Sequence, residues 1–281
     1  MQATAPGGIR LPASLIRGRR RLSAMTFDVA ADAYDAFMGR YSRPLSTPFA
    51  DLAGVTAGQR VLDVGCGTGM LTGELVARVG AANVVAIDPS TPFVAAMRTR
   101  FPGVEVHQAG VNALPFANGT FDAALAQLVV HFLSDPVGGI REMARVTRPG
   151  GVVVASVWDH AGGQGPLGVF WAAAHDLDPD VKDESVMPGA AEGHLAALFR
   201  DAELREVREG TVEARREHAT FEEWWEPFTR GVGPAGAYVA GLDPAARNAL
   251  REACRARQPQ PPFTVTAVAW TARGTVPDGP G

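Results

Sequence analysis

Residues 61 to 69 form an apolar run that leads directly into three alternating glycines, with the sequence Val-Leu-Asp-Val-Gly-Cys-Gly-Thr-Gly. Gly65, Gly67 and Gly69 carry no Cβ, so the backbone can turn sharply there and a ligand can approach main-chain atoms. A helix that starts at about Met70 would point its N-terminus at that ligand. The pattern predicts a strand, a tight turn and a helix that together bind a nucleoside cofactor.

The spacing of the glycines separates two classes of nucleotide site. Dinucleotide-binding dehydrogenases use the spacing G-x-G-x-x-G, and here Met70 stands where the third glycine of that motif would fall. A pyrophosphate cradle is therefore disfavoured. The next apolar run ends in Asp88, whose carboxylate is placed to accept hydrogen bonds from the two hydroxyls of a ribose. The glycine turn and Asp88 thus agree on an adenosine-type ligand.

These motifs resemble those of the class I S-adenosylmethionine-dependent methyltransferases, in the small-molecule branch that includes the ubiquinone and menaquinone biosynthesis enzymes. The resemblance rests on four segments in the family's order, at residues 61–69, 85–90, 113–122 and 145–151. It implies an α/β, Rossmann-like fold with a mostly parallel seven-stranded sheet, an antiparallel last strand and helices on both faces. It also implies S-adenosyl-L-methionine as the cofactor.

Periodicity in the sequence fits that fold. Apolar runs predict strands at residues 60–64, 83–88, 104–108, 121–126 and 152–158. Gly and Pro signals mark predicted helices at residues 70–79, 92–101 and 136–146. Alternating strands and helices are typical of a parallel sheet that binds ligands at the carboxyl ends of its strands. In the family, the last strand, here at residues 263–270, pairs with the one near residues 204–213.

Length and composition predict a single domain with extended ends. The 281 residues are 46% hydrophobic and 20% charged, which is typical of a globular chain. We assign residues 25–273 to one methyltransferase domain, with an N-terminal lid at 25–50 and a substrate-wall insertion at about 159–193. A basic leader at 1–24 and a tail at 274–281 are predicted to be disordered. A true start at the methionine in position 25 would explain the leader without any function.

Charge and cysteine usage exclude several classes of partner. The leader holds five arginines and no acid, so the rest of the chain is more acidic than the net charge of −4 suggests, which argues against nucleic acid. Cys66 and Cys254 are far apart, which suits a reducing compartment and predicts a cytoplasmic protein. No apolar run approaches the roughly 20 residues that span a bilayer, and no metal-ligand spacing stands out. A homodimer remains an open alternative.

The resemblance assigns cofactor contacts to five parts of the chain. The predicted contacts are Tyr34, Arg40, Asp63, Gly65, Cys66, Gly67, Gly69, Asp88, Pro89, Val111, Asn112, Gln127 and Leu128. In the family, the lid arginine pairs with the methionine carboxylate, for which a guanidinium can offer two parallel hydrogen bonds. The acid at position 63 helps to hold the methionine amino group, or else only hydrogen-bonds the glycine turn. Cys66 is expected to fill the turn with its side chain and not to act as a nucleophile.

One position departs from the family pattern. Many relatives place an aspartate five residues before the proline of the Leu-Pro-Phe segment, where it accepts a bond from the adenine amino group, and this chain has Gly110 there. Val111 can still offer its backbone N–H and its side chain to the adenine, and the amide of Asn112 is a substitute acceptor. Loss of one such hydrogen bond weakens binding by about 0.5 to 1.5 kcal/mol.

Methyl transfer chiefly needs a nucleophile held in line with the sulfonium methyl and a site that excludes water. His131, after the fourth predicted strand, is the predicted general base, and the alternative is a histidine packed on the surface. Weaker candidates are His175, Tyr34 and Asp159.

The residues after the fourth predicted strand also bear on the acceptor. They read Gln-Leu-Val-Val, not the Asn/Asp-Pro-Pro-aromatic motif of adenine-amino methyltransferases, which favours a small, partly hydrophobic acceptor. Several aromatic residues line its pocket or else pack in the core: Trp158, Phe170, Trp171, Trp224, Trp225 and Phe228.

Two other functions remain open from the sequence. A noncatalytic protein that binds S-adenosylmethionine or another nucleoside would explain Gly110 and the lack of a compelling base. A nicotinamide-dependent oxidoreductase is disfavoured by Met70. The leading prediction is a small-molecule methyltransferase.

Overall fold

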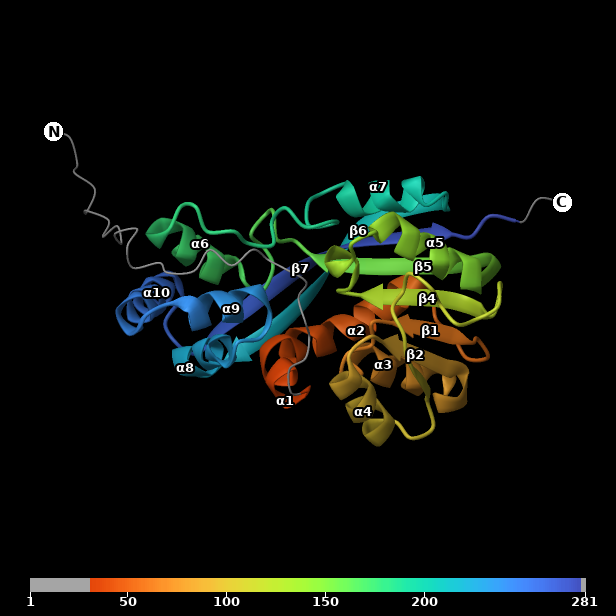
Figure 1. The fold of residues 1–281 in the computed structure, drawn as a ribbon, viewed down its shortest axis with the longest axis horizontal. Helices are drawn as coiled ribbons and strands as arrows, with labels where there is room; N and C mark the ends of the chain where they lie inside the picture. The colour runs from red at the N-terminus through yellow and green to blue at the C-terminus, as the bar shows by residue number, and fades with distance from the viewer. Residues whose placement is uncertain (1–30, 279–281) are drawn as a thin grey trace.

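The computed structural model describes residues 31–278, and a seven-stranded sheet forms its centre (Figure 1). The strands are β1 (Val61–Val64), β2 (Val84–Asp88), β3 (Glu105–Gln108), β4 (Phe121–Gln127), β5 (Thr147–Trp158), β6 (Arg205–His218) and β7 (Phe263–Thr275). They are ordered β3-β2-β1-β4-β5-β7-β6, and β7 runs antiparallel to both of its neighbours while the other strands are parallel to one another. The predicted Rossmann-like fold is confirmed.

Helices cover both faces of the sheet (Figure 1). The helical elements are α1 (Ala31–Tyr34), the π-helical turn η2 (Asp35–Gly39), α2 (Arg40–Ala53), α3 (Met70–Val79), η3 (Ala81–Asn83), α4 (Thr91–Arg100), η4 (Val130–Phe132), α5 (Pro136–Val146), α6 (Gly168–Leu177), α7 (His194–Asp201), α8 (Phe221–Trp225), η5 (Glu226–Arg230), α9 (Gly233–Gly241) and α10 (Pro244–Arg257). Helices α2, α3 and α4 lie on one face, and α5 and α7 lie on the other.

Alternating side chains of each central strand supply the two halves of the core. Leu62 and Val64 of β1 pack with the layer that includes α5 and α7, whereas Val61 packs with the layer of α2 and α3. All three are 1% exposed or less. Strands that are buried on both faces read as continuous apolar runs, as parallel sheets require.

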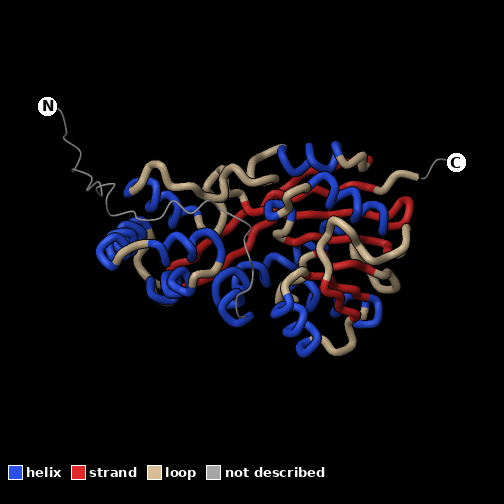
Figure 2. The backbone as a smooth tube through the Cα atoms, in the orientation of Figure 1, coloured by secondary structure: helices blue, strands red, loops and turns tan. Residues whose placement is uncertain are grey.

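The strands β6 and β7 reach well beyond the other strands, and a second helical lobe packs on their far ends (Figure 2). Helices α6, α8, α9 and α10 form this lobe around an aromatic cluster, in which the rings of Phe170 and Phe228 stack at 4.7 Å. Five of the aromatic residues with two predicted roles are core residues of this lobe: Phe170, Trp171, Trp224, Trp225 and Phe228.

The C-terminal end of the sheet extends further than the sequence predicted. Thr275 is still part of β7, and Val276 exchanges backbone hydrogen bonds with Gly150 and Gly151 at 3.0 and 2.9 Å. The tail prediction for residues 274–281 is therefore wrong over 274–276, because these residues pair with the start of β5. The predicted leader at 1–24 and the first residues of the lid, 25–30, lie outside the described part of the chain.

Candidate active site

The glycine turn connects β1 to α3, and its three glycines have different roles. Gly65, Gly67 and Gly69 all have positive φ, at +68°, +53° and +91°. A Cβ on Gly65 would lie 2.5 Å from a methyl carbon of Val129. A Cβ on Gly69 would lie equally close to Met97 and Phe101, whereas no atom lies closer than 3.9 Å to the same position on Gly67. Cys66 is buried, and burial raises the pKa of its thiol well above the usual value, so it fills the turn as expected. Only Gly67 is open towards a ligand.

Asp88 ends β2 directly beside this turn. Its side chain is 6% exposed, and its two oxygens accept hydrogen bonds from the backbone N–H groups of Gly67 and Ser90, at 2.9 and 2.8 Å. Burial raises the pKa of the carboxyl group, and the two N–H donors counteract that effect. Each oxygen of a carboxylate has a further lone pair, so the geometry leaves Asp88 able to accept from a ribose diol.

Asp63, at the end of β1, is held from α3. The hydroxyl of Thr72 donates to its carboxylate at 2.5 Å. Burial raises the pKa of Asp63 to about 7, with Asp88 adding to the shift. Hydrogen bonds from Thr72 counteract the effect of burial only in part, so this carboxyl group is costly to ionise. An ammonium group at this end of the strand would stabilise the ionised form.

The lid closes on the glycine turn through Tyr34. Its ring lies 3.9 Å from the position that a Cβ on Gly67 would take, and it contacts Phe93 of α4 with ring centroids 5.1 Å apart. Burial and the charge of Asp88 raise the pKa of the Tyr34 hydroxyl. The predicted aromatic lid residue therefore lies over the glycine turn, and its contact with the cofactor stays a prediction.

Asp35 anchors the lid next to Tyr34, a feature that the sequence analysis missed. Its carboxylate accepts from the hydroxyl of Thr68, inside the glycine turn, and forms an ion pair with Arg100 at 2.9 Å. Arg100 also donates to the backbone oxygen of Thr68 at 2.6 Å. The available signal was that Asp35 directly follows the lid aromatic Tyr34. Its ion-pair partner Arg100, however, is 65 residues away along the chain.

The structure does not place Arg40 where the sequence analysis expected it. Its guanidinium donates to three backbone oxygens, of Phe37 at 3.1 Å, Glu223 at 3.0 Å and Trp224 at 3.1 Å. These bonds tie α2 to α8 of the helical lobe and use a donor of each of the three guanidinium nitrogens. From the sequence, we expected Arg40 to bind the methionine carboxylate. In the structure it instead joins α2 to the helical lobe.

Gln127 is the last residue of β4, and Leu128 follows it directly. The side-chain amide of Gln127 donates to the backbone oxygen of Ser42 at 2.9 Å, and its Oε1 is buried without a partner in residues 31–278. Leu128 has φ +62°, a left-handed conformation that costs a side-chain-bearing residue about 1–2 kcal/mol. Such strain clusters at functional sites, and no local sequence signal announces it.

The predicted adenine side is the most open part of the site. Pro89 and Asn112 are exposed, whereas Val111 is buried with its side chain packed towards α5. A Cβ on Gly110 would have no atom within 4 Å. The structure thus leaves space beside Gly110, and the role of Asn112 as a substitute acceptor stays a prediction.

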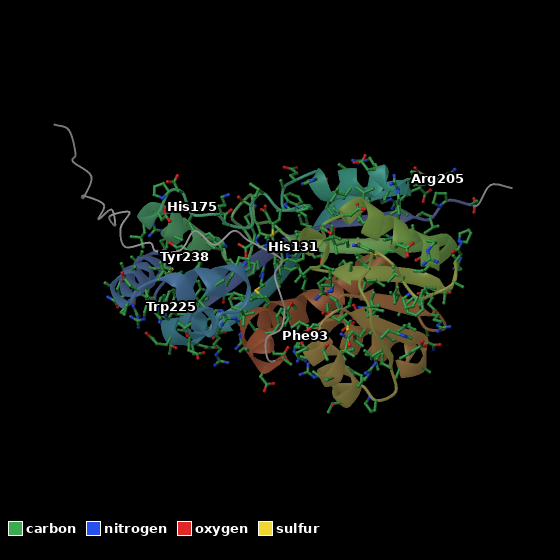
Figure 3. All side chains as sticks on the ribbon, in the orientation of Figure 1. Phe93, His131, His175, Arg205, Trp225 and Tyr238 are labelled. Carbon is green, nitrogen blue, oxygen red and sulfur yellow. The ribbon has the colours of Figure 1, made fainter. Side chains whose placement is uncertain are left out.

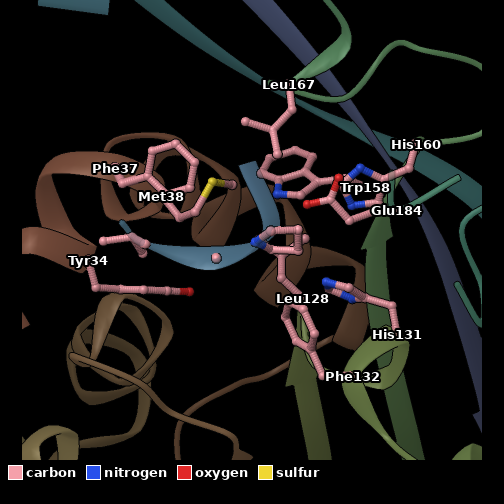
Figure 4. A pocket seen from close by; sticks show the side chains of 13 residues that line it. Tyr34, Phe37, Met38, Leu128, His131, Phe132, Trp158, His160, Leu167 and Glu184 are labelled. Carbon is pink, nitrogen blue, oxygen red and sulfur yellow. The ribbon is translucent and has the colours of Figure 1, made fainter. Parts of the chain in front are cut away.

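A small, mostly apolar pocket, with a cavity of about 40 Å³, adjoins the lid (Figure 4). It is lined by Tyr34, Phe37, Met38, Leu128, His131, Phe132, Trp158, His160, Leu167, Glu184, Val232, Gly233 and Pro234. Its residues come from the lid, the segment after β4 that includes η4, the end of β5, the segment 159–193 and the start of α9. Its lining is mostly apolar with a few polar groups, which is the character of sites that bind small organic ligands.

Three buried polar atoms in this pocket have no hydrogen-bond partner among the described residues: His131 Nδ1, Trp158 Nε1 and Glu184 Oε2. Burial, with a contribution from His160, lowers the pKa of His131 well below its usual value. Burial also lowers the pKa of His160 to about 4 and raises that of Glu184 to about 7. The pocket thus holds two imidazoles that are neutral at pH 7.

The weaker base candidates have other partners. His175 lies on α6 and contacts Asp183 at 2.9 Å, away from His131 (Figure 3). Asp159 accepts from the backbone N–H of Gly162 at 2.8 Å and from the amide of Gln164 at 3.0 Å, so it stabilises its own loop. In residues 31–278, no cluster suited to a metal ion is present and no helix has the length and apolarity to cross a membrane.

The groups around the turn fit a nucleoside with a positively charged centre. Gly67 offers an uncrowded backbone, and Asp88 offers a carboxylate beside it. Two further groups offer oxygen atoms to a positive charge: Gln127, through its unpartnered Oε1, and Asp63, through its buried carboxylate. A sulfonium or an ammonium would stabilise both.

Known proteins with similar sequences or folds agree with this geometry. Residues 62–155 match the family described as a methyltransferase domain. A demethylmenaquinone methyltransferase of Renibacterium salmoninarum is 35% identical over 153 residues, which cover 53% of this chain and 63% of the relative. The ubiquinone/menaquinone biosynthesis C-methyltransferase of Bdellovibrio bacteriovorus is 30% identical over 179 residues, covering 60% of this chain and 72% of the relative.

Solved structures show the same fold. The YcgJ protein of Bacillus subtilis has a TM-score of 0.54 at 17% identity, covering 83% of this chain and 99% of that protein. The curated relatives are matched over less of their length, since the chain spans between about half and about three quarters of each. The comparisons therefore describe the nucleoside-binding part of the molecule better than its pocket.

Proposed function

This chain belongs to the class I S-adenosylmethionine-dependent methyltransferases, and we propose that it transfers a methyl group to a small, partly hydrophobic organic acceptor. The acceptor would bind in the apolar pocket. Gly67 and Asp88 would hold the adenosine part of the cofactor. Asp63 would face its amino group, and Gln127 would lie near the sulfonium.

The observation that carries this proposal is that the nucleoside site and the pocket share a wall. Tyr34 lies over Gly67 and also lines the pocket, and Leu128 lines the pocket directly after the end of β4. An acceptor in the pocket is therefore adjacent to the cofactor site, and such proximity is the main requirement for an in-line displacement.

His131 is the proposed base within the pocket. When bound, S-adenosylmethionine supplies an electrophilic methyl group. The imidazole of His131 is neutral at pH 7, and its unpartnered Nδ1 can accept a proton from the attacking group of the acceptor. The apolar walls of the pocket exclude water from the reacting atoms.

Calorimetric titration with S-adenosylmethionine, S-adenosylhomocysteine and NADH tests the cofactor site. We expect micromolar binding of the first two ligands, a loss of at least about tenfold in Asp88→Ala, and no change in the control Asp201→Ala, which removes an exposed carboxylate. NADH binding that is tighter than S-adenosylmethionine binding would revive the oxidoreductase alternative.

Transfer from radiolabelled S-adenosylmethionine to a panel of phenols, quinols and amines tests catalysis. His131→Asn should lower the transfer rate by about 100-fold or more while leaving the affinity for S-adenosylhomocysteine unchanged. Cofactor binding without transfer to any member of the panel would favour the noncatalytic alternative.

A further inference from the structure

The acceptor pocket contains a buried carboxylate without a cationic partner. Glu184 is 3% exposed, and its Oε2 has no hydrogen-bond partner in the described part of the chain. None of the pocket residues is a lysine or an arginine. The charge of the neighbouring Asp183 raises the pKa of Glu184 further, after burial itself. A buried carboxylate is stable in its ionised form only with a cation or several hydrogen-bond donors.

Aromatic rings surround the same pocket. Tyr34, Phe37, Phe132 and Trp158 all line it, and Figure 4 shows them on different sides of one space. The faces of aromatic rings attract cations such as ammonium groups. The imidazole of His131 does not oppose a cation, because it is neutral at pH 7.

The residues that make this part of the pocket differ from those that identify the family. Glu184 comes from the segment 159–193, and the methyltransferase-domain match ends at residue 155. The family match therefore places no constraint on what Glu184 binds.

We propose that the pocket recognises an amine in its protonated form, with Glu184 pairing with the ammonium group and the aromatic rings covering its apolar part. This inference rests on the proposed function, because it names the class of the methyl acceptor. His131 Nδ1 offers a second acceptor for an ammonium N–H, and it would take the proton that the amine must lose before its nitrogen lone pair can attack the methyl group. An amine that also carries an oxygen would satisfy the unpartnered indole N–H of Trp158.

Calorimetry with two probes of equal shape tests the inference without any need for turnover. We would titrate 2-phenylethylamine and 2-phenylethanol into the wild type, into Glu184→Gln and into Glu192→Gln. Glu192 is an exposed glutamate of the same segment, so its variant removes the same charge outside the pocket. The wild type and Glu192→Gln should bind the amine about tenfold more tightly than the alcohol, and Glu184→Gln should bind both alike.

Equal affinity of the wild type for the two probes, tighter binding of the alcohol, or no amine binding at millimolar concentration would overturn the inference. An amine preference that persists in a folded Glu184→Gln would do so as well. The probe preference of the wild type is decisive even where the variant does not fold. S-adenosylmethionine titrated into the same samples separates the two proposals, because its failure to bind would remove the proposed function and leave the amine result intact.

Discussion

Alanine substitution at the three turn glycines should separate stability from cofactor binding. All three residues have positive φ, a conformation that costs an alanine about 1–2 kcal/mol. At Gly65 and Gly69 a Cβ would also lie 2.5 Å from neighbouring side-chain atoms, and overpacking of that kind adds about 1–3 kcal/mol. We therefore expect losses of about 2–5 kcal/mol for Gly65→Ala and Gly69→Ala and about 1–2 kcal/mol for Gly67→Ala.

Binding should follow the opposite order. A Cβ on Gly67 has room in the protein but would occupy the face that a ligand approaches. Gly67→Ala should therefore weaken S-adenosylhomocysteine binding by at least about tenfold, or 1.4 kcal/mol. Folded samples of the other two variants should bind nearly as tightly as the wild type.

Urea unfolding followed by tryptophan fluorescence, together with calorimetric titration, measures both quantities. Gly58→Ala is the matched control, because Gly58 has φ +89° and a Cβ there would have no atom within 4 Å. It should lose only the conformational contribution of about 1–2 kcal/mol and bind normally. The reasoning is refuted if Gly67→Ala is as unstable as Gly65→Ala, or if it binds S-adenosylhomocysteine like the wild type.

Three further predictions address the lid, the buried acid and the adenine side. Arg40→Gln should lower the free energy of unfolding by about 2–3 kcal/mol, because it removes charged donors to backbone oxygens of α8. It should leave S-adenosylhomocysteine affinity unchanged. A large loss of affinity would show that Arg40 does bind the methionine carboxylate. Folding raises the pKa of Asp63 to about 7, so the native state keeps a proton that the unfolded state releases, and stability falls as the pH rises from about 4 to about 7. Asp63→Asn should thus be more stable than the wild type in urea at pH 8 and similar to it at pH 4, and an equal difference at both pH values would contradict this. Gly110→Asp should tighten S-adenosylmethionine binding by up to about tenfold where Gly110→Ala does not, since a side chain has room there; equal affinities in calorimetry would show that the carboxylate does not reach the adenine.

Short-range chemistry explains why much of the nucleoside site was predictable. Positive φ at Gly65, Gly67 and Gly69 is a local requirement that only glycine meets without strain. Gly and Pro signals identified α3 and α5 with the observed bounds. Asp88 lies at the end of a strand, and parallel strands bring their carboxyl ends to one edge of the sheet, so its meeting with Gly67 followed from the fold class.

Contacts between distant segments were not predictable in this way. Arg40 stands where a lid arginine is expected, yet its partners are 183 and 184 residues away, on a helix that the sequence did not place next to the lid. The aromatic residues after position 168 read equally well as pocket or core, and only the packing of the helical lobe on β6 and β7 assigned them to the core.

The sequence by itself determined the cofactor class, because a glycine turn and a strand-end acid are defined by local backbone geometry and by one residue type each. The tertiary structure alone decided the apolar pocket. Glu184 and His131 come from separate segments, and their lack of partners exists only once the chain has enclosed them. Burial is a property of the whole fold, so the raised pKa of Glu184 and the lowered pKa of His131 have no signature in the residues beside them.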